Sequence, residues 1–347
     1  MKIYILIYIL FLIFAIGDFV RKRQQLLMLL LLAVILVIFI GFRNETGADS
    51  RNYITFFKEQ TDTLWKWKNV EKGYAEHGFY YLSVLLKSIW NNVNFYFVSI
   101  SLLTIFFLVK SLRRYSVYPI LGLCIYYSRF LILRDMNQIR QALAVSILIY
   151  GLHYLILRKE KSFMVLVLIA SMIHYSSLII VPFFWLYNKK ITFKSCIWIL
   201  TFSSICGLCG GLIIKQILVS SGNMLMLTYV NVENLGIGNP VILFQIVVCT
   251  LFFHFESILK DKQEGYYIIR NAYLYSVVLL LLTCNLGEVG GRLATIFATC
   301  EIFIIPALAL AIKPRICGYF VCLSIGVFLF ALNYMKLLNQ PDIWMYI

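Results

Sequence analysis

The stretch QQLLMLLLLAVILVIFIGF, residues 24–42, decides the class of fold. It contains no charged residue, and it directly follows the basic triplet Arg21-Lys22-Arg23. A helix that crosses a bilayer needs about 20 mainly apolar residues, so we expect this segment to span a membrane. Basic residues collect in cytoplasmic loops. We therefore expect the triplet to lie inside and Arg43, at the other end of the span, to lie outside.

The rest of the chain repeats this apolar pattern. Of its 347 residues, 61% are hydrophobic and 14% are charged, and the mean hydropathy is +0.85. A soluble domain has about 45–50% apolar and about 25% charged residues, so a water-soluble enzyme and a disordered chain are both excluded. Apolar runs predict spans at 3–20, 24–42, 93–112, 116–133, 141–157, 195–214, 240–258, 267–286, 292–312 and 316–337.

These runs predict an all-α integral membrane protein. We expect one polytopic domain over 1–347, a bundle of about 11–12 transmembrane helices with short interfacial helices. The net charge of +15 would suggest a nucleic-acid partner in a soluble protein. Here about half of the basic residues fall in short loops, as the positive-inside rule predicts, and we expect no nucleic-acid partner. The clusters are Arg21-Lys22-Arg23, Lys110 with Arg113-Arg114, Arg158-Lys159 with Lys161, Lys189-Lys190 with Lys194, Lys260 with Lys262, and Lys313 with Arg315.

Placing all six clusters in the cytoplasm leaves both termini and four connections outside, namely 43–92, 134–140, 215–239 and 287–291. Two segments strain this scheme. Segment 78–90 is too short to span easily, and an amphipathic helix at the outer interface fits it better. Segment 162–187 has cytoplasmic clusters at both ends. It is either a short helical hairpin with His174 at its tip or one tilted span with Lys189 outside.

Arginines outside the basic clusters are the main functional signal. Arg43, Arg134, Arg140 and Arg292 all lie at the predicted outer boundary of the membrane, where the positive-inside rule disfavours them. Arginine binds phosphate through a planar fork and keeps its charge at physiological pH. One interpretation is a clamp for the diphosphate of a lipid. The alternative is that these arginines reach lipid head groups or pair with Asp135 and Glu288.

Other candidates are weaker. Loop 43–77 balances six acidic with six basic residues and carries Trp65, Trp67 and Tyr74, which suits either a polar ligand such as a sugar or a solvated loop with an interfacial aromatic belt. His174 is an ionisable residue inside an apolar segment and is a functional candidate for that reason. No histidine or cysteine spacing predicts a metal site, no nucleotide-binding motif is present, and we expect no cofactor.

Four segments together resemble the EpsG-type branch of the Wzy-like polysaccharide polymerases. FRNETGADSRNY (42–53) is similar to the family's first loop, with its Arg, Gly-x-Asp and Tyr falling on Arg43, Gly47, Asp49 and Tyr53. IRQALAVSI (139–147) resembles its Arg-Gln-x-x-Ala helix start, ASMIHYSSLIIVP (170–182) its His-x-Ser stretch, and GGRLATIF (290–297) its late outer-loop arginine. The resemblance covers about residues 20–310.

This resemblance implies a multi-pass glycosyltransferase of the bacterial inner membrane, with a GT-C-like fold and an active site facing the periplasm. The implied reaction transfers a growing glycan from undecaprenyl diphosphate to a new lipid-linked repeat unit, as in O-antigen, lipopolysaccharide or exopolysaccharide biosynthesis. It needs no metal. Donor and acceptor are both undecaprenyl-diphosphate-linked oligosaccharides, the surrounding lipids are further partners, and a chain-length regulator protein is expected.

The implied chemistry assigns roles to named residues. Arg140 and Arg292, then Arg43 and Arg134, would stabilise the leaving diphosphate. Asp49 is the first candidate for the general base and His174 the second. Sugar contacts are assigned to Tyr53, Arg51, Gln141, Glu288, Trp65 and Trp67.

Three rival functions remain at this stage. A flippase for lipid-linked saccharide would need cations along a path open to both sides, whereas these arginines gather on one side. An O-antigen ligase would share the chemistry and differ in its acceptor. An integral-membrane acyltransferase would need an acyl-transfer pair, and none stands out.

Overall fold

The apolar runs form helices because lipid offers no partner for a free backbone N–H or C=O group. The computed structural model describes residues 2–66, 75–220, 236–285 and 288–346. Its elements up to the middle of the chain are α1 (Lys2–Phe14), η1 (Ala15–Phe19), α2 (Lys22–Gly41), α3 (Ser50–Thr55), η2 (Phe56–Gln60), α4 (His77–Ile89), α5 (Val93–Tyr115), α6 (Pro119–Tyr126), η3 (Tyr127–Asp135), α7 (Ile139–Ile156), α8 (Glu160–Ile173) and η4 (Tyr175–Trp185).

The remaining elements follow in the second half of the chain. Its elements are α9 (Phe193–Ser220), α11 (Pro240–His254), α12 (Glu256–Leu259), α13 (Tyr266–Leu282), α14 (Glu288–Ala298), α15 (Glu301–Leu308), η5 (Ala309–Ala311), α16 (Arg315–Leu338) and α17 (Pro341–Trp344). The described residues form no β-sheet. They contain one isolated bridge, between Thr63 and Lys66.

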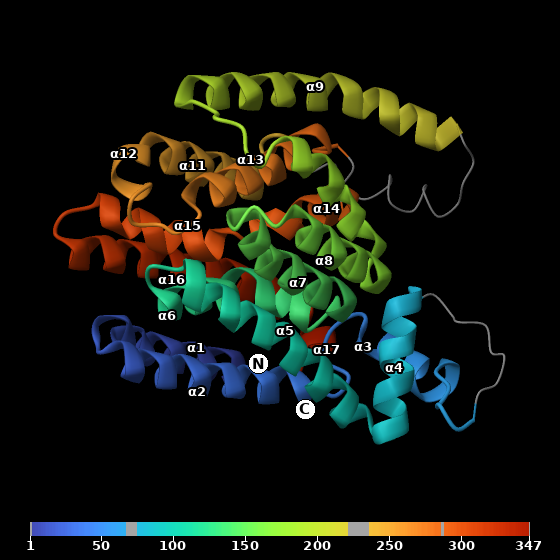
Figure 1. Ribbon diagram of the computed structural model, residues 1–347. Helices are drawn as coiled ribbons and strands as arrows, with labels where there is room; N and C mark the ends of the chain where they lie inside the picture. The colour runs from blue at the N-terminus through green and yellow to red at the C-terminus, as the bar shows by residue number, and fades with distance from the viewer. Residues whose placement is uncertain (1, 67–74, 221–235, 286–287, 347) are drawn as a thin grey trace.

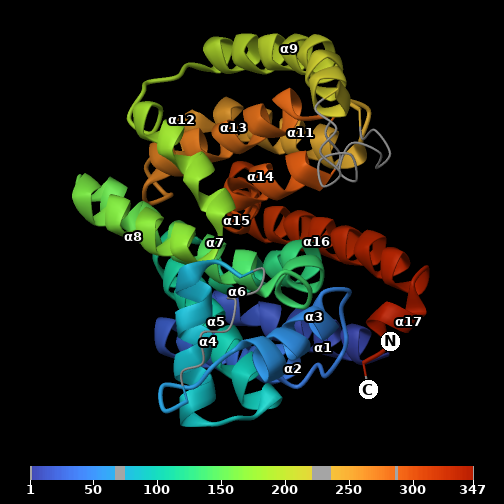
Figure 2. The ribbon, with the colours of Figure 1, turned by 90° about the vertical axis from the view of Figure 1, so that its right-hand side faces the viewer.

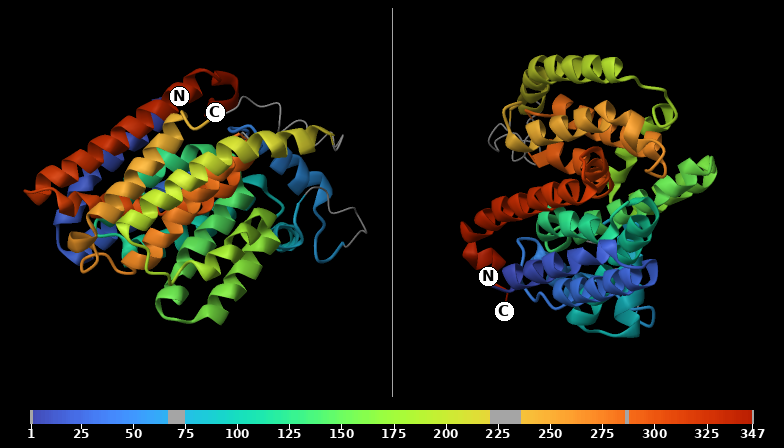
Figure 3. Two further views of the ribbon diagram at one scale, coloured as in Figure 1. Left: turned by 90° about the horizontal axis from the view of Figure 1, so that it is seen from above. Right: turned by 90° about the vertical axis from the view of Figure 1, so that its left-hand side faces the viewer.

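The helices stack in layers, with the long ones roughly aligned. Figures 1 and 2 both show α9 at one extreme, then α11 and α13, then α14 and α15, with α1 and α2 on the opposite side of the bundle. The packed helix pairs agree with this order, since α9 packs on α13, α13 on α11, α11 on α15, and α2 on α5. Figure 3 shows the same alignment from above and from the other side.

The all-α polytopic prediction is confirmed. Among the described residues, six helices are long and apolar enough to cross a membrane, and α14 with α15, bent by 53°, would make a seventh. The other expected spans are shorter or interrupted: α11 and α13 have 15 and 17 residues, and α6 continues into the π-helical η3.

Contacts between loops that are distant in sequence show which loops lie together at each end of the bundle. At one end, Arg114 pairs with Glu264 across 2.9 Å, and the amide of Gln263 donates to the carbonyl of Tyr115. At the other end, the backbone of Gly47 donates to the carbonyl of Ile343 at 2.9 Å. The predicted cytoplasmic clusters lie at the first end. Both chain termini and the loop after α2 lie at the second, which we call the outer end, following the prediction.

Segment 162–187 forms a helical hairpin. The rings of Phe163, at the start of α8, and Phe184, at the end of η4, lie 5.8 Å apart, and the Tyr187 hydroxyl donates to the Glu160 carboxylate. His174 is the turn between the two arms. The return arm is a 3₁₀-helix, which rises about 2.0 Å per residue instead of about 1.5 Å. Eleven residues therefore match the 14-residue α8 in length, which resolves the apparent shortage of chain.

The structure refines the predicted outer connections. Within 43–92, α4 stands across the direction of the long helices, as expected of an interfacial helix (Figures 1 and 2). The connection predicted at 134–140 narrows to 136–138, because η3 continues through Asp135 and α7 begins at Ile139. The prediction of a loop at 287–291 is wrong from Glu288 onward, because the Gly-rich turn is already helical in α14. Residues 215–220 belong to α9, and 221–235 lie outside the described residues.

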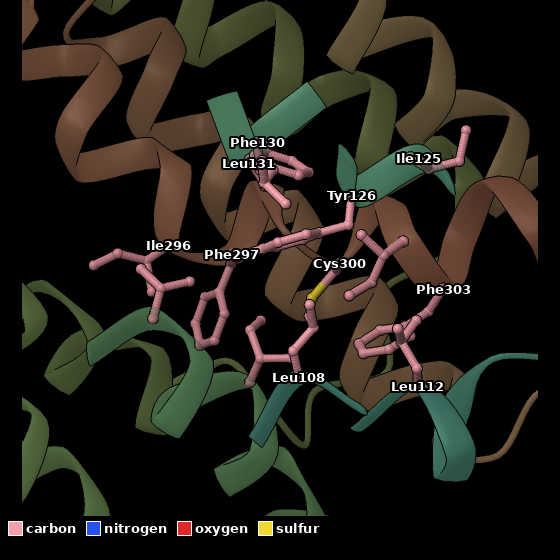
Figure 4. Close-up of a cluster of buried hydrophobic side chains, with 14 of the residues drawn as sticks. Leu108, Leu112, Ile125, Tyr126, Phe130, Leu131, Ile296, Phe297, Cys300 and Phe303 are labelled. Carbon is pink, nitrogen blue, oxygen red and sulfur yellow. The ribbon is translucent and has the colours of Figure 1, made fainter. Parts of the chain in front are cut away.

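The core of the bundle is packed with apolar side chains from α5, α6, η3, α14 and α15 (Figure 4). Tyr115 and Phe303 lie 5.5 Å apart towards the basic end, and Tyr126 and Phe130 lie 6.0 Å apart towards the outer end. Cys300 is fully buried and lies between Tyr126 and Phe303 (Figure 4). This packed region separates the outer end from the basic end.

Candidate functional site

An arginine-lined cavity of about 360 Å³ lies at the outer end, between η3, α11, α13 and α14. Its polar lining consists of three arginines, three amides and Thr295, and no carboxylate is among the described residues that line it. The arginines are Arg129, Arg134 and Arg292, and the amides are Asn137, Gln138 and Gln245. A cavity with several guanidinium groups and no lining acid is suited to a polyanion such as a diphosphate. We call it the arginine cavity.

The π-helical form of η3 explains how two of these arginines share the cavity. In a π-helix the hydrogen bond runs from residue i to i+5, and here the backbone N–H of Met136 donates to the carbonyl of Leu131. Arg129 and Arg134 are five residues apart. In an α-helix that spacing would point their side chains to different faces, whereas the wider turn lets both line the arginine cavity.

Arg134 points into the protein rather than to the lipid. The residue is 4% exposed, and its Nη1 donates to the Thr299 hydroxyl at 2.8 Å. Its guanidinium carbon lies 4.8 Å from the centre of the Phe130 ring. An arginine that reached outward for lipid head groups would be exposed. The alternative of a lipid-facing Arg134 therefore does not fit this structure.

Arg129 is held by a buried carboxylate. Its Nε donates to Oε2 of Glu301 at 3.2 Å, and Glu301 is 0% exposed. Oε1 of the same carboxylate accepts a hydrogen bond from the Tyr273 hydroxyl at 3.1 Å. Buried charges persist when they are paired and hydrogen-bonded. Glu301 therefore fixes the position of Arg129 in the wall of the arginine cavity.

Glu76 joins two of the predicted site residues. One of its oxygens accepts from Arg140 Nη1, and the other lies 3.0 Å from His174 Nδ1 and accepts from the backbone N–H of Tyr175. Burial alone would raise the pKa of Glu76, but the hydrogen bond with His174 and the charge of Arg140 outweigh it, and the pKa lies below its ordinary value. Glu76, Arg140 and His174 form what we call the Glu76 cluster.

Two hydrogen bonds connect neighbouring parts of the outer end. Gln141, next to Arg140, donates through Nε2 to the carbonyl oxygen of Arg292 at 2.7 Å. Asn137, which lines the arginine cavity, accepts through Oδ1 from the backbone N–H of Asp49 at 2.8 Å. Gln141 thus contacts the backbone of the late arginine, and Asp49 lies beside the cavity rim.

Gly47 explains why a glycine precedes Asp49 in the first outer loop. Its φ angle is +104°, a conformation that residues with a side chain rarely adopt. A Cβ atom at this position would lie 2.0 Å from the carbonyl oxygen of Met136. The loop that carries Asp49 can therefore press against the η3–α7 connection only because residue 47 has no side chain.

Arg43 has a different environment from the one predicted. It is 0% exposed, its Nη1 donates to the carbonyl of Asp135 at 2.6 Å, and its guanidinium lies 4.2 Å from the centre of the Phe97 ring. These contacts tie the end of α2 to the end of η3 and to α5. In this structure Arg43 supports the outer end from within and does not line the arginine cavity.

The predicted sugar contacts are dispersed. Tyr53 is 3% exposed, packs against Phe79 and contacts Arg140, so its ring offers no open stacking surface. Arg51 is exposed and pairs with Glu45 at 2.8 Å. Trp65 is 83% exposed, next to Leu64, whose N–H donates to Ser88 at the far end of α4 from Glu76. Trp67 and the side chain of Glu288 lie outside the described residues.

Three residues that the sequence interpretation did not single out belong to the site, namely Arg129, Glu76 and Glu301. Arg129 and Glu301 lie within the predicted spans 116–133 and 292–312. An ionisable residue inside a membrane segment is a functional candidate by default, so that rule could have found both. Glu76 is one of six acidic residues in a polar loop, and no local signal separates it from the others.

The fold and this site define an all-α polytopic membrane protein with a cationic cavity at one end of its bundle. The chain belongs to the EpsG family, whose model matches residues 26–346. It is also similar to the amylovoran biosynthesis protein AmsC of Erwinia amylovora, with 24% identity over 321 residues that cover 86% of this chain and 83% of that protein. No solved structure matches the chain. The family resemblance seen in the motifs is thus confirmed.

Proposed function

We propose that this protein is a membrane glycosyltransferase that polymerises lipid-diphosphate-linked oligosaccharide repeat units in exopolysaccharide biosynthesis. The donor is the growing glycan on undecaprenyl diphosphate, and the acceptor is a new lipid-linked repeat unit on the outer face of the inner membrane. Membership of the EpsG family and the similarity to an amylovoran biosynthesis protein support this class of reaction. The observation that carries the proposal is the gathering of Arg129, Arg134 and Arg292 around one cavity.

The arginine cavity suits the leaving group of this reaction. When the bond between the donor sugar and the diphosphate breaks, its electrons pass to the diphosphate oxygen, which gains negative charge. Preoriented cations that face this oxygen stabilise the transition state more than the ground state. Arg134 and Arg292 are assigned this role, with Arg129 as a third cation held by Glu301.

The acceptor sugar supplies the nucleophile. Its hydroxyl oxygen forms the new glycosidic bond, and its proton passes to a general base. Asp49 remains the first candidate for the general base, because its backbone N–H donates a hydrogen bond to Asn137 at the cavity rim. His174 keeps the second, because Glu76 orients its ring through Nδ1. Arg140, which pairs with Glu76, is assigned to positioning the Glu76 cluster rather than to direct diphosphate contact.

A transporter of the same lipid is the main competing function. A flippase requires a polar path from one side of the membrane to the other. Within the described residues, apolar side chains fill the bundle between the arginine cavity and the basic end (Figure 4). This packing favours a reaction at one face over passage through the protein.

The decisive experiment analyses the surface glycan of cells that lack the gene. We expect surface polymer to disappear while single repeat units still reach the outer leaflet, with polymer restored by the wild-type gene but not by Arg292→Ala. Lys58→Ala, which removes an exposed cation from an outer loop and has no assigned role in the site, is the matched control and should restore polymer. Repeat units trapped in the cytoplasmic leaflet would instead identify a flippase and overturn the proposal.

A further inference from the structure

A second polar cavity, of about 670 Å³, lies at the basic end, where η4, α9, α12 and α13 meet. Its size falls within the range of about 300–1,000 Å³ that is typical of small-molecule sites. Basic residues from separate segments line it, with one carboxylate, that of Glu256. The basic residues are Arg158, Lys189, Lys190, Lys260 and Arg270. We call it the basic-end cavity.

The single carboxylate is already engaged. Glu256 accepts a hydrogen bond from Arg270 Nη1 at 2.8 Å and one from the Tyr267 hydroxyl at 3.1 Å. Arg270 is 1% exposed, and its guanidinium carbon lies 4.3 Å from the centre of the Phe253 ring. Arg270 and Glu256 therefore neutralise each other in the floor of the cavity. Among the ion pairs of the described residues, none involves Lys189, Lys190 or Lys260.

The loop that carries two of these lysines is anchored. Asn271, which is 1% exposed, donates through Nδ2 to the carbonyl oxygens of Leu186, Tyr187 and Lys189 at 3.0, 3.2 and 2.9 Å. A loop whose only task was to carry topology-setting charge would not need a buried amide to hold its backbone. The anchor places Lys189 and Lys190 on a fixed cavity wall, facing the same space as Lys260.

Apolar residues mark this cavity as a membrane-boundary site. Ile191, Phe193 and Ile268 also line it, and Phe193 begins a helix that is long and apolar enough to cross the membrane. Basic pockets between membrane helices on the cytoplasmic side bind the head groups of anionic lipids. The positive-inside rule accounts for the number of basic residues at this end, but it does not require them to enclose one cavity.

We propose that the basic-end cavity binds a phosphate-bearing ligand at the membrane surface, the head group of an anionic phospholipid. The cations Lys189, Lys190 and Lys260 contact the phosphate, and Ile191 and Phe193 contact the first part of the acyl chain. This site is separate from the arginine cavity, at the other end of the bundle. The inference does not depend on the reaction proposed above.

The test uses the purified full-length protein in bilayer nanodiscs of phosphatidylcholine, with and without phosphatidylglycerol, and counts retained lipids by native mass spectrometry. The wild type should retain phosphatidylglycerol. Lys189→Ala/Lys190→Ala should bind it about fivefold more weakly for each lysine removed. Lys159→Ala/Lys161→Ala is the matched control, because it removes the same charge at the same end from two residues that do not line the cavity.

Equal weakening by the two double variants would show that the basic end attracts anionic lipid only through its overall charge, and would overturn the proposal. A parallel arm adds inorganic phosphate to the protein in phosphatidylcholine nanodiscs and follows the unfolding temperature. If phosphate stabilises the wild type but not Lys189→Ala/Lys190→Ala, and the wild type retains no phosphatidylglycerol, the cavity is a phosphate site. Its ligand is then a free phosphate rather than a lipid. Absence of both effects would overturn the proposal.

Discussion

Arg129 Nε and Glu301 Oε2 lie 3.2 Å apart and connect the wall of the arginine cavity to the packed core. Removing one partner of a buried ion pair leaves an uncompensated charge and costs about 3–5 kcal/mol. We expect Glu301→Gln to lower the stability of the purified protein by this amount, measured by unfolding in detergent. Glu264→Gln breaks an exposed pair with Arg114 and should cost less than about 1 kcal/mol.

A double variant distinguishes the loss of the ion pair from a change in the packing around residue 301. Arg129→Gln/Glu301→Gln removes both charges, so it should be more stable than Glu301→Gln alone. If the double variant were as unstable as the single one, the cost would arise from packing around residue 301 rather than from the unpaired arginine.

The arginine cavity predicts a loss of polymerisation in Arg134→Ala and Arg292→Ala. Removing one group that stabilises developing charge lowers a rate by about 10²–10³. We expect surface polymer to be lost in complemented deletion cells while immunoblots show normal amounts of the protein in the membrane. The lysine variants should recover only part of the activity, because a lysine cannot form the planar fork. Wild-type polymer from both alanine variants would exclude the diphosphate clamp.

The Glu76 cluster predicts a pH-dependent stability with a definite sign. The folded-state pKa of Glu76 lies below the ordinary value of 4.5, so the unfolded chain binds more protons between these two values. The stabilisation is complete above about pH 4.5 and is lost as the pH falls through the lowered pKa. Unfolding temperatures of the wild type and of Glu76→Gln should therefore converge in acid. A difference that stays constant at every acidic pH at which the protein still folds would contradict this assignment.

The two candidate bases can be separated by variants that remove one proton acceptor at a time. Asp49→Asn keeps the size of the side chain and removes its ability to accept a proton, so we expect the rate to fall by about 10²–10⁴ while binding of lipid-linked substrate persists. The assay is polymer formation from lipid-linked repeat units with the purified protein in proteoliposomes. If Asp49→Asn is fully active and His174→Asn is not, the base is His174, oriented by Glu76.

Gly47 offers a test of the loop that carries Asp49. Gly47→Ala places a Cβ against the Met136 carbonyl at a φ of +104°, and we expect it to cost about 1–3 kcal/mol and to lower activity by displacing Asp49. Gly210→Ala is the control, because a Cβ at Gly210 has no heavy atom within 4 Å and alanine favours a helix. Equal behaviour of the two variants in unfolding and polymerisation assays would contradict this interpretation of Gly47.

The spans and the ends of the bundle could be predicted because each depends on a short continuous segment. Whether residues 24–42 enter lipid depends on their own apolar length, and Arg21-Lys22-Arg23 predicts which boundary is the inner one by charge alone. The sequence does not separate a hairpin at 162–187 from one tilted span, because the length of this segment matches neither one span nor two. The 3₁₀ form of the second arm, which stretches eleven residues to the length of α8, decides in favour of the hairpin.

Only part of the candidate site could be predicted from the sequence. Arg134 and Arg292 stood out at a face where arginine is disfavoured, and the structure brings both to one cavity. Arg43 carried the same signal, yet the structure buries it against Asp135 and Phe97. An arginine at the disfavoured face marks an unusual position, but it does not reveal the direction in which its side chain points.

The sequence alone therefore determined a polytopic helical protein with its extra arginines at one end, because lipid burial and loop charge act on neighbouring residues. The tertiary structure alone decided which charges meet. Glu76 and His174 come together from 98 positions apart, and Arg129 shares a cavity with Arg134 only through the π-helical turn of η3. Such contacts depend on how helices pack and on their local winding, and neither is encoded in the apolar length of a single segment.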